Sequence, residues 1–137
     1  MNRYDLHRLA AARLADAKVL FRHDRFGGCY YLAGYAVECG LKACIAKKTR
    51  RYDFPDKNSV LDAYTHDLSK LLRVTGLEET LKIAWALDPD LRLNWYKVIE
   101  WSEQSRYEMY DRHFAERMLR AVADSRHGVL RWLRQHW

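Results

Sequence analysis

A segment in the N-terminal half of the chain, residues 28–42, repeats apolar residues with the spacing of a helix. These residues stand three or four positions apart and continue just beyond the segment: Tyr30, Ala33 or Gly34, Val37, Leu41 and Cys44. At roughly 3.6 residues per turn, the series keeps one apolar face for about four turns. The pattern predicts a helix that packs in the core.

The same helix contains two glycines and one carboxylate among its apolar residues. A glycine in a helix interior costs about 1 kcal/mol relative to alanine, so Gly34 and Gly40 indicate places where another helix backbone comes close. Glu38 lies at the edge of the apolar face. If this carboxylate is buried it must be paired, and an arginine or histidine of another helix is the expected partner.

A first helix is expected from Asn2 or Asp5 to Asp24. One of its faces is apolar and is predicted to point inward: Leu6, Ala10, Ala17, Leu20 and Phe21. Its outer face is basic: Arg3, Arg8, Arg13, Lys18 and Arg22. Gly27 and Gly28 are expected to turn the chain into the second helix.

The middle of the chain contains the longest predicted break, residues 49–64, around Pro55. Thr65 is expected to cap a short helix that reaches Arg73, because threonine is a favoured N-cap residue. Gly76 is expected to end that helix.

Two further helix starts follow, and then a last helix. Glu78 and Glu79 suit the positive end of a helix dipole in a first turn. Asp88 followed by Pro89 combines a capping residue with proline at the first helical position. The last helix is expected to begin near Asp111 and to reach the C-terminus.

Composition supports one compact helical domain. The 137 residues are 49% hydrophobic and 13% aromatic, which is enough material for a core. The two prolines fall at predicted element boundaries, which favours long helices over many short strands. We therefore expect a single all-α domain over residues 1–137, an antiparallel bundle of four to six helices.

The sequence also indicates the cellular setting. The charged N-terminal segment has no apolar signal core, and no run approaches the roughly 20 apolar residues that a membrane span needs. We expect a cytoplasmic protein that does not contact membranes. Cys29, Cys39 and Cys44 form no CxxC pair and have no histidine nearby at ligand spacing. Buried reduced thiols are predicted rather than a zinc site, and no metal or cofactor is expected.

Charge is unevenly distributed around a net charge of +6. Residues 42–51 contain five basic side chains and no acid, and residues 112–137 contain six arginines against Glu116 and Asp124. Residues 53–111 contain twelve acids against seven basic residues. Clustered cations are typical of proteins that bind nucleic acid or phosphate, and a solvated basic helix face is the alternative. The acidic middle beside basic ends also suits self-association or a charged protein partner.

Four segments together resemble a known family. They are the alanine- and arginine-rich first helix before Phe26, residues 28–42, the helix start at residues 65–68, and residues 101–107 before a final helix that ends in Trp132-Leu133. Their order and spacing resemble the HEPN superfamily, small helical-bundle domains found in prokaryotic toxin–antitoxin and defence systems. The resemblance spans nearly the whole chain and implies a HEPN-like bundle.

The resemblance also implies a function and a site. Many HEPN proteins carry an arginine, four to six further residues and a histidine near the start of the last helix. Two subunits bring these motifs together in a metal-independent ribonuclease site. Histidine can move the proton of a ribose 2′-hydroxyl, and arginine can hold the scissile phosphate. The family resemblance further implies a homodimer and an antitoxin partner of the nucleotidyltransferase type.

The sequence offers three arginine–histidine pairs with this spacing: Arg106/His113, Arg120/His127 and Arg131/His136. Position selects the first pair, because it straddles the junction into the last helix. A helix N-terminus there presents free backbone N–H groups to a phosphate. Arg106 and His113 are therefore the predicted catalytic residues.

A second interpretation of the same residues is purely structural. Arg106 then pairs with Glu38 or Asp111. In the ribonuclease members the residue after the arginine is usually small and polar, whereas Tyr107 stands there in this chain. Residues 101–107 also resemble HEPN members without an evident nuclease motif. The chain is then a non-catalytic module that binds a nucleotide, RNA or a protein partner.

The remaining polar residues of the last helix are predicted to form a basic stripe with Arg134 and Asp124. The RNA- or nucleotide-binding residues expected on this stripe are Arg117, Arg120, His127 and Arg131. His136 falls on the apolar face and is interpreted as a core or end-cap histidine. His66 beside Asp67 is interpreted as a local capping arrangement rather than a catalytic pair. Packing is the expected role of most tryptophans and tyrosines, rather than base stacking.

Overall fold

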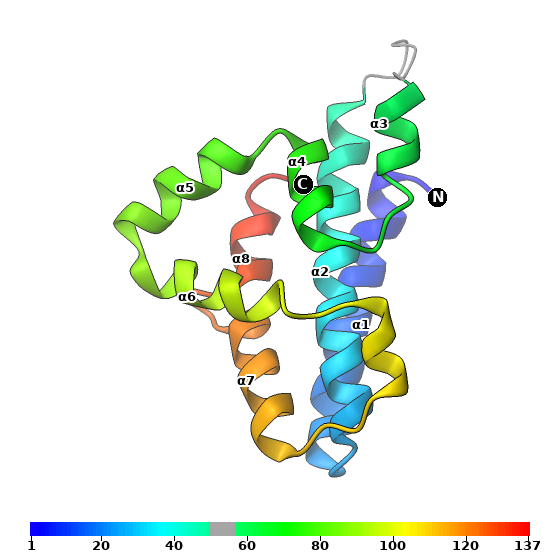
Figure 1. The fold of residues 1–137 in the computed structure, drawn as a ribbon, viewed down its shortest axis with the longest axis vertical. Helices are drawn as coiled ribbons and strands as arrows, with labels where there is room; N and C mark the ends of the chain where they lie inside the picture. The colour runs from blue at the N-terminus through cyan, green and yellow to red at the C-terminus, as the bar shows by residue number, and fades with distance from the viewer. Residues whose placement is uncertain (50–56) are drawn as a thin grey trace.

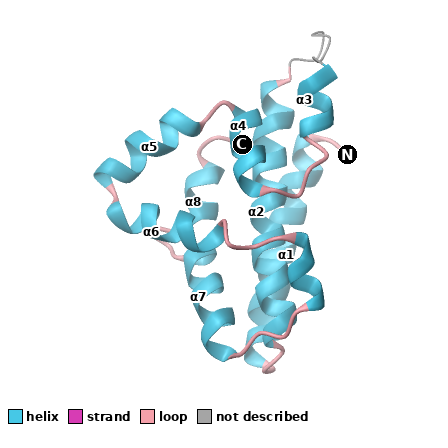
Figure 2. Cartoon of the chain, in the orientation of Figure 1, coloured by secondary structure: helices cyan, strands magenta, loops and turns pink. Residues whose placement is uncertain are grey.

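The structure is a computed structural model that describes residues 1–49 and 57–137. Its elements in chain order are α1 (Arg3–Arg22), α2 (Phe26–Lys48), α3 (Lys57–Asp62), α4 (Leu68–Thr75), α5 (Glu78–Leu87), α6 (Pro89–Val98), the 3-10 helix η1 (Glu103–Tyr107), α7 (Arg112–Ala123) and α8 (Val129–Arg134). The predicted all-α class is confirmed, and the described residues contain no strand (Figure 2). They form more helices than the four to six expected, because the predicted break contains α3 and the predicted last helix is divided into α7 and α8. None of the helices in this part of the chain is both long and apolar enough to span a membrane.

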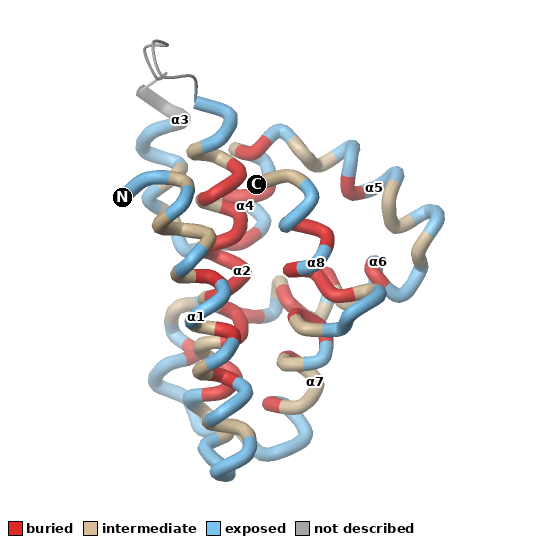
Figure 3. The backbone as a smooth tube through the Cα atoms, turned by 180° about the vertical axis from the view of Figure 1, so that it is seen from behind, coloured by how far each residue is buried: buried red, intermediate tan, exposed pale blue. Residues whose placement is uncertain are grey.

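The central element of the fold is α2. It runs antiparallel to α1 and also contacts α4, α7, α8 and η1 (Figure 1). Figure 3 shows buried residues in the middle part of α2, and they extend from Cys29 to Cys44. Six consecutive residues, 36–41, are all buried, which a helix with one apolar face does not allow. The predicted helix is therefore confirmed, and it is surrounded rather than packed on one side.

The turn between α1 and α2 differs from the expected one. It is made by residues 23–25, where Asp24 adopts the left-handed region with a φ of 58°. Aspartate tolerates this region better than most residues. Gly27 and Gly28 instead belong to the first turn of α2, and a Cβ on Gly28 would lie 3.0 Å from Leu20 Cδ1. The glycines thus permit close packing of the two helices rather than forming the turn.

The predicted break over residues 49–64 contains a helix, α3, which the sequence did not indicate. Pro55 lies outside the described residues, as do the cations at positions 50 and 51. The predicted cap at Thr65 is wrong by two positions. Asp67 caps α4, because its Oδ1 accepts a hydrogen bond from the Lys70 N–H at 3.0 Å, and Thr65 Oγ1 accepts from the Asp67 N–H.

The helix boundaries predicted from local chemistry in the middle of the chain are confirmed. Gly76 ends α4 with a φ of 75°, and α5 begins at Glu78. Asp88 accepts a hydrogen bond from the Leu91 N–H at 3.2 Å, with Pro89 at the first position of α6. α6 packs on α7 and α8, while α5 contacts α4 and α6 and projects from the bundle (Figure 1).

The predicted continuous last helix is wrong, because the chain breaks between α7 and α8. The Asp124 carboxylate accepts hydrogen bonds from the N–H groups of Arg126 and His127 at 2.8 and 2.7 Å. A Cβ on Gly128 would lie 2.4 Å from the Asp124 carbonyl oxygen, so only glycine fits this turn. The apolar series continues through the break in the sequence, which is why periodicity alone missed it.

The close approaches predicted at Gly34 and Gly40 are present, but they involve side chains rather than a helix backbone. A Cβ on Gly34 would lie 2.2 to 2.4 Å from three atoms of the Trp101 ring. A Cβ on Gly40 would lie 3.1 Å from a methyl carbon of Leu133. Trp101 is only 3% exposed, and its Nε1 donates a hydrogen bond to the Tyr31 carbonyl oxygen at 3.1 Å.

We predict that Gly34→Ala destabilises the protein by about 2 to 3 kcal/mol, because the buried indole must move to admit a methyl group. Gly27→Ala in the same helix is the control, since its Cβ would meet only the Glu108 carbonyl oxygen at 3.7 Å. Urea denaturation of the two variants measures the difference. Equal stability would contradict the packing described for Gly34.

Candidate functional site: a cationic depression on helices α6 and α7

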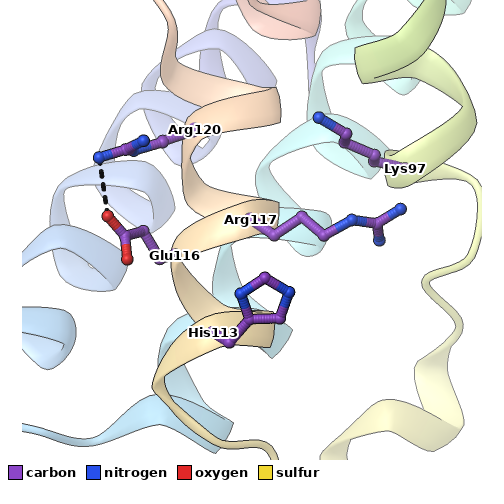
Figure 4. Close-up of a pocket in the computed structure, with 5 residues that line it drawn as sticks. All are labelled: Lys97, His113, Glu116, Arg117 and Arg120. Carbon is purple, nitrogen blue, oxygen red and sulfur yellow. Dashed lines mark ion pairs between the residues drawn. The ribbon is translucent and has the colours of Figure 1, made fainter.

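An open depression of about 370 Å³ lies on the surface of α7 where α6 packs against it. Its lining is almost entirely charged or titratable: Lys97, His113, Glu116, Arg117 and Arg120 (Figure 4). The start of α7 is fixed by Asp111, whose Oδ1 accepts a hydrogen bond from the Phe114 N–H at 3.1 Å. His113 is consequently in the first turn of the helix, as the sequence predicted.

Helical spacing places these side chains outside the core. Ala115, Met118, Ala121 and Val122 form the buried face of α7. His113 and Arg117 are four residues apart and point to the same side of the helix, toward Lys97 of α6 (Figure 4). The Glu116–Arg120 ion pair lies on the other flank of α7 in this view.

Two of the three cations have acidic partners. Arg117 contacts both carboxylate oxygens of Glu100, at 2.7 and 3.5 Å, and Arg120 Nη2 lies 2.7 Å from Glu116 Oε1. Within residues 1–49 and 57–137, no carboxylate forms an ion pair with Lys97 or His113. Exposed ion pairs contribute only about 0 to 1 kcal/mol, so a phosphate can compete for both arginines at little cost. The depression is therefore suited to an anionic ligand.

Arg106, the other predicted catalytic residue, lies outside the depression. It is exposed in η1, with its guanidinium carbon 4.8 Å from the centroid of the Tyr107 ring. The structural pairing considered for it is wrong, because Glu38 is bound by Lys42 and His66.

The structure thus does not bring Arg106 and His113 of one chain together. Figure 1 shows η1 and the start of α7 on opposite sides of α2, joined by an extended connection. Asp111 within that connection caps α7 and leaves Arg106 without the second structural partner considered for it. The catalytic roles of Arg106 and His113 stay predictions.

Glu38 is the charged side chain buried most deeply in the described part of the chain, at 2% exposure. Its Oε1 lies 2.9 Å from both Lys42 Nζ and His66 Nδ1, which confirms the expected pairing with a histidine. The other imidazole nitrogen of His66 lies 3.2 Å from Glu103 Oε2. His66 therefore connects α2 to η1, the element that carries Arg106, and takes no part in the cap of α4, which Asp67 forms.

His127 and Arg131 do not belong to the depression, so the predicted continuous basic stripe is wrong. They line a separate cavity beside Asp88, because the chain turns after Ala123. His127 Nδ1 lies 2.8 Å from Asp88, and the His127 carbonyl oxygen accepts a hydrogen bond from Asn94 at 2.9 Å. These contacts hold the turn between α7 and α8 against α6.

The same histidine belongs to a group with two carboxylates that has the composition of a metal site. Ligand atoms of Asp88, Asp90 and His127 all lie within 4.8 Å of one another. Asp88, however, already accepts hydrogen bonds from His127 and from the start of α6. The geometry is explained by interhelical hydrogen bonding, and we assign no metal to it.

His136 and the three cysteines have the structural roles predicted for them. His136 packs against Trp132 with ring centroids 4.5 Å apart, and burial lowers its pKa. Three buried cysteines form no disulfide: Cys29, Cys39 and Cys44. Burial raises the pKa of each thiol to about 11. Thiols with such pKa values are poor nucleophiles at neutral pH.

Sequence reasoning missed Lys97. It lies in the acidic middle of the chain and 16 positions before His113 in the numbering, so no local pattern connects them. Only the packing of α6 on α7 brings the two together. By contrast, the spacing of Arg117 and Arg120 along one helix was sufficient to predict that both lie on an exposed surface.

The contact between His127 and Asp88 predicts a pH-dependent stability. The hydrogen bond with Asp88 raises the pKa of His127 above its ordinary value of 6.5. Burial disfavours ionised Asp88, but hydrogen bonds from His127 and Leu91 outweigh burial and lower its pKa below 3.8. His127 therefore contributes fully to folding stability below pH 6.5, and this contribution is lost as the pH rises through its raised pKa. The contribution of Asp88 to folding stability is lost as the pH falls through its lowered pKa.

We therefore predict that His127→Gln lowers the melting temperature more at roughly pH 5.5 to 6 than at roughly pH 9. The lower pH range lies below the raised pKa of His127 and above the lowered pKa of Asp88. The exposed His23→Gln is the control. Both variants retain the partly buried His7 and His136, whose pKa values are lowered. The effects of these two histidines on stability therefore cancel when His127→Gln is compared with His23→Gln. A difference that is constant with pH would contradict the assigned contact.

The comparisons with known proteins identify a family. The sequence matches the family described as HEPN domain over residues 4–136, which is nearly the whole chain. No curated protein and no solved structure matches it. The family match confirms the resemblance found from the four sequence segments, and it assigns no role to an individual residue.

Proposed function

The chain belongs to the HEPN domain family, and we propose that it is a metal-independent endoribonuclease that acts as a dimer. The observation that supports this most directly is the position of His113. Its imidazole is exposed in a depression that also contains Lys97 and Arg117, and no carboxylate forms an ion pair with it in the described residues. A proton acceptor beside cations is what cleavage of a phosphodiester by its own 2′-hydroxyl requires.

The proposed reaction uses these groups as follows. His113 accepts the proton of a ribose 2′-hydroxyl, and the 2′-oxygen bonds to the adjacent phosphorus. The bond from phosphorus to the 5′-oxygen breaks, and a protonated side chain or water supplies the proton that the departing oxygen takes. Lys97 and Arg117 stabilise the additional negative charge on the phosphate oxygens. Because the nucleophile belongs to ribose, DNA is not a substrate.

The position of Arg106 supports the proposed dimer. This residue lies outside the His113 depression of its own chain, and exposed apolar side chains adjoin both residues: Tyr107 at 72%, Met109 at 98% and Phe114 at 47% exposure. Burying these side chains against a second copy is favourable. We propose that the second copy supplies its Arg106 to the depression. We further propose that the activity serves a cytoplasmic toxin–antitoxin or defence system, restrained by a nucleotidyltransferase-type partner.

The second candidate is a non-catalytic module that binds RNA or a nucleotide. It is favoured by the contact of Arg106 with Tyr107, which accounts for the guanidinium without a catalytic role. In this case the depression binds phosphate, but His113 transfers no proton. The two candidates share the binding surface and differ in whether the bound RNA is cleaved.

We predict that the wild-type protein cleaves single-stranded RNA in EDTA and leaves DNA of the same sequence intact. His113→Ala should lower the cleavage rate at least about 100-fold, because general acid–base groups contribute 10²- to 10⁴-fold. Arg106→Ala should also be impaired, whereas His23→Ala, an exposed histidine at the end of α1, should cleave like wild type. Gel analysis of end-labelled RNA measures the rates and identifies the cyclic phosphate ends.

Binding measured on the same samples separates the candidates. Salt-dependent RNA affinity without cleavage would favour the non-catalytic module. Cleavage that persists in His113→Ala would rule out the proposed proton acceptor. Absence of both binding and cleavage would contradict both candidates.

A further inference from the structure

Three side chains on α5 and α6 form an aromatic and cationic cluster. The rings of Trp85 and Tyr96 are stacked, with centroids 5.8 Å apart and an interplanar angle of 23°. The guanidinium carbon of Arg92 lies 5.8 Å from the Trp85 centroid and 5.7 Å from the Tyr96 centroid. The arginine is thus within cation–π distance of both rings.

Core packing does not account for the position of Tyr96. This residue is 47% exposed and Arg92 is also exposed, whereas Trp95 on the same helix is 4% exposed. Trp85 is intermediate and contacts the edge of the core. The cluster therefore combines a supported ring, Trp85, with a tyrosine and an arginine that remain accessible to a ligand.

The cluster and the cationic depression share helix α6, which carries Arg92, Tyr96 and Lys97. Tyr96 directly precedes Lys97, so their Cα atoms are about 3.8 Å apart. Lys97 lines the depression together with Arg117 and His113. Because consecutive side chains of a helix point about 100° apart, a strand whose phosphate contacts Lys97 crosses the exposed face of α6 to place a neighbouring base on the Tyr96 ring.

We propose that Trp85, Arg92 and Tyr96 form a stacking site for an unpaired base of single-stranded RNA whose phosphate occupies the depression. This inference rests on the proposed function and specifies its substrate class. Aromatic rings and arginine planes stack on bases that are splayed out of a strand, whereas the bases of a duplex are already stacked on one another. The site therefore selects single-stranded over double-stranded RNA and does not read base identity.

A protein partner is the competing occupant of this surface. Ile83, Leu87 and Leu93 are also exposed on α5 and α6, at 67%, 87% and 57%. None of these apolar side chains accounts for an arginine within cation–π distance of two aromatic rings on the helix that also carries Lys97. That combination of cation and ring favours nucleic acid.

The test measures affinity by fluorescence anisotropy with a 2′-O-methyl RNA 12-mer, in which the nucleophile is blocked, and with the duplex of the same sequence. Tyr96→Ala should weaken binding of the single strand roughly tenfold, the loss expected for one stacked base. Tyr96→Phe should bind like wild type because the ring remains. Tyr64→Ala, which removes a tyrosine that is 76% exposed elsewhere, is the matched control.

Two further variants keep the test independent of any effect of Tyr96→Ala on folding. Arg92→Gln should weaken single-strand binding while leaving the Trp85 ring in place. Lys97→Ala should weaken binding of both RNAs and reduce the dependence of affinity on salt, whereas Tyr96→Ala should leave the salt dependence unchanged. Melting temperatures establish that the variants are folded.

Several results would overturn the stacking site. The proposal fails if neither Tyr96→Ala nor Arg92→Gln weakens single-strand binding, or if both weaken binding of the duplex as much as binding of the single strand. If instead these variants retain RNA affinity and lose self-association, the surface is a protein contact. In each case His113-dependent cleavage by the wild type would remain, so the failure is distinct from failure of the proposed function. If the wild type binds no RNA, both proposals fail together.

Discussion

The burial of α2 on all sides is the constraint on which the rest of the structure depends. Small residues along this helix, including Ala33, Ala36 and Gly34, have their surface covered by neighbouring elements. Each surrounding helix consequently contributes one apolar face to α2 or to its neighbours and turns its charged face to solvent. On α7 this division places Met118 inward and leaves His113 and Arg117 on the surface. The cationic depression is a consequence of how α7 and α6 cover the core.

The same central helix contains Glu38, which would be unfavourable in a core without partners. Lys42 provides one partner from the next turn, and His66 provides the other from the segment before α4. Because His66 also approaches Glu103, the position of η1 is connected to a carboxylate in the core. The proposed catalytic arginine is therefore carried by an element whose placement depends on a buried charge.

The sequence predicted the structure well where local chemistry determines it. Asp88 and Pro89 begin a helix, and Gly76 ends one, because a cap acts on the backbone within a turn of itself. The break after Ala123 was missed because the apolar series passes through it, although Asp124 and Gly128 provide a local signal for a turn. The sequence alone likewise could not distinguish Gly28, which packs closely against α1, from a glycine in a turn.

The candidate site was predictable only in part, for the same physical reason. Arg117 and Arg120 share one helix, so their spacing predicts a common surface. Lys97 reaches them through tertiary packing, and Tyr96 reaches Trp85 through the packing of α5 on α6. His127 was placed with this group by a helical repeat that the turn interrupts. Contacts between elements, rather than residue types, decided which predicted residues came together.

The central claim is that RNA occupies the depression with a phosphate beside His113. The most direct measurement is an NMR titration of the six histidine side chains with uncleavable 2′-O-methyl RNA, assigned through single histidine-to-glutamine variants. The account predicts that the His113 imidazole resonances shift most, while those of His127, held by Asp88, and of His136, packed on Trp132, stay nearly unchanged. Saturating RNA that leaves His113 unshifted, or that shifts His127 instead, would contradict it.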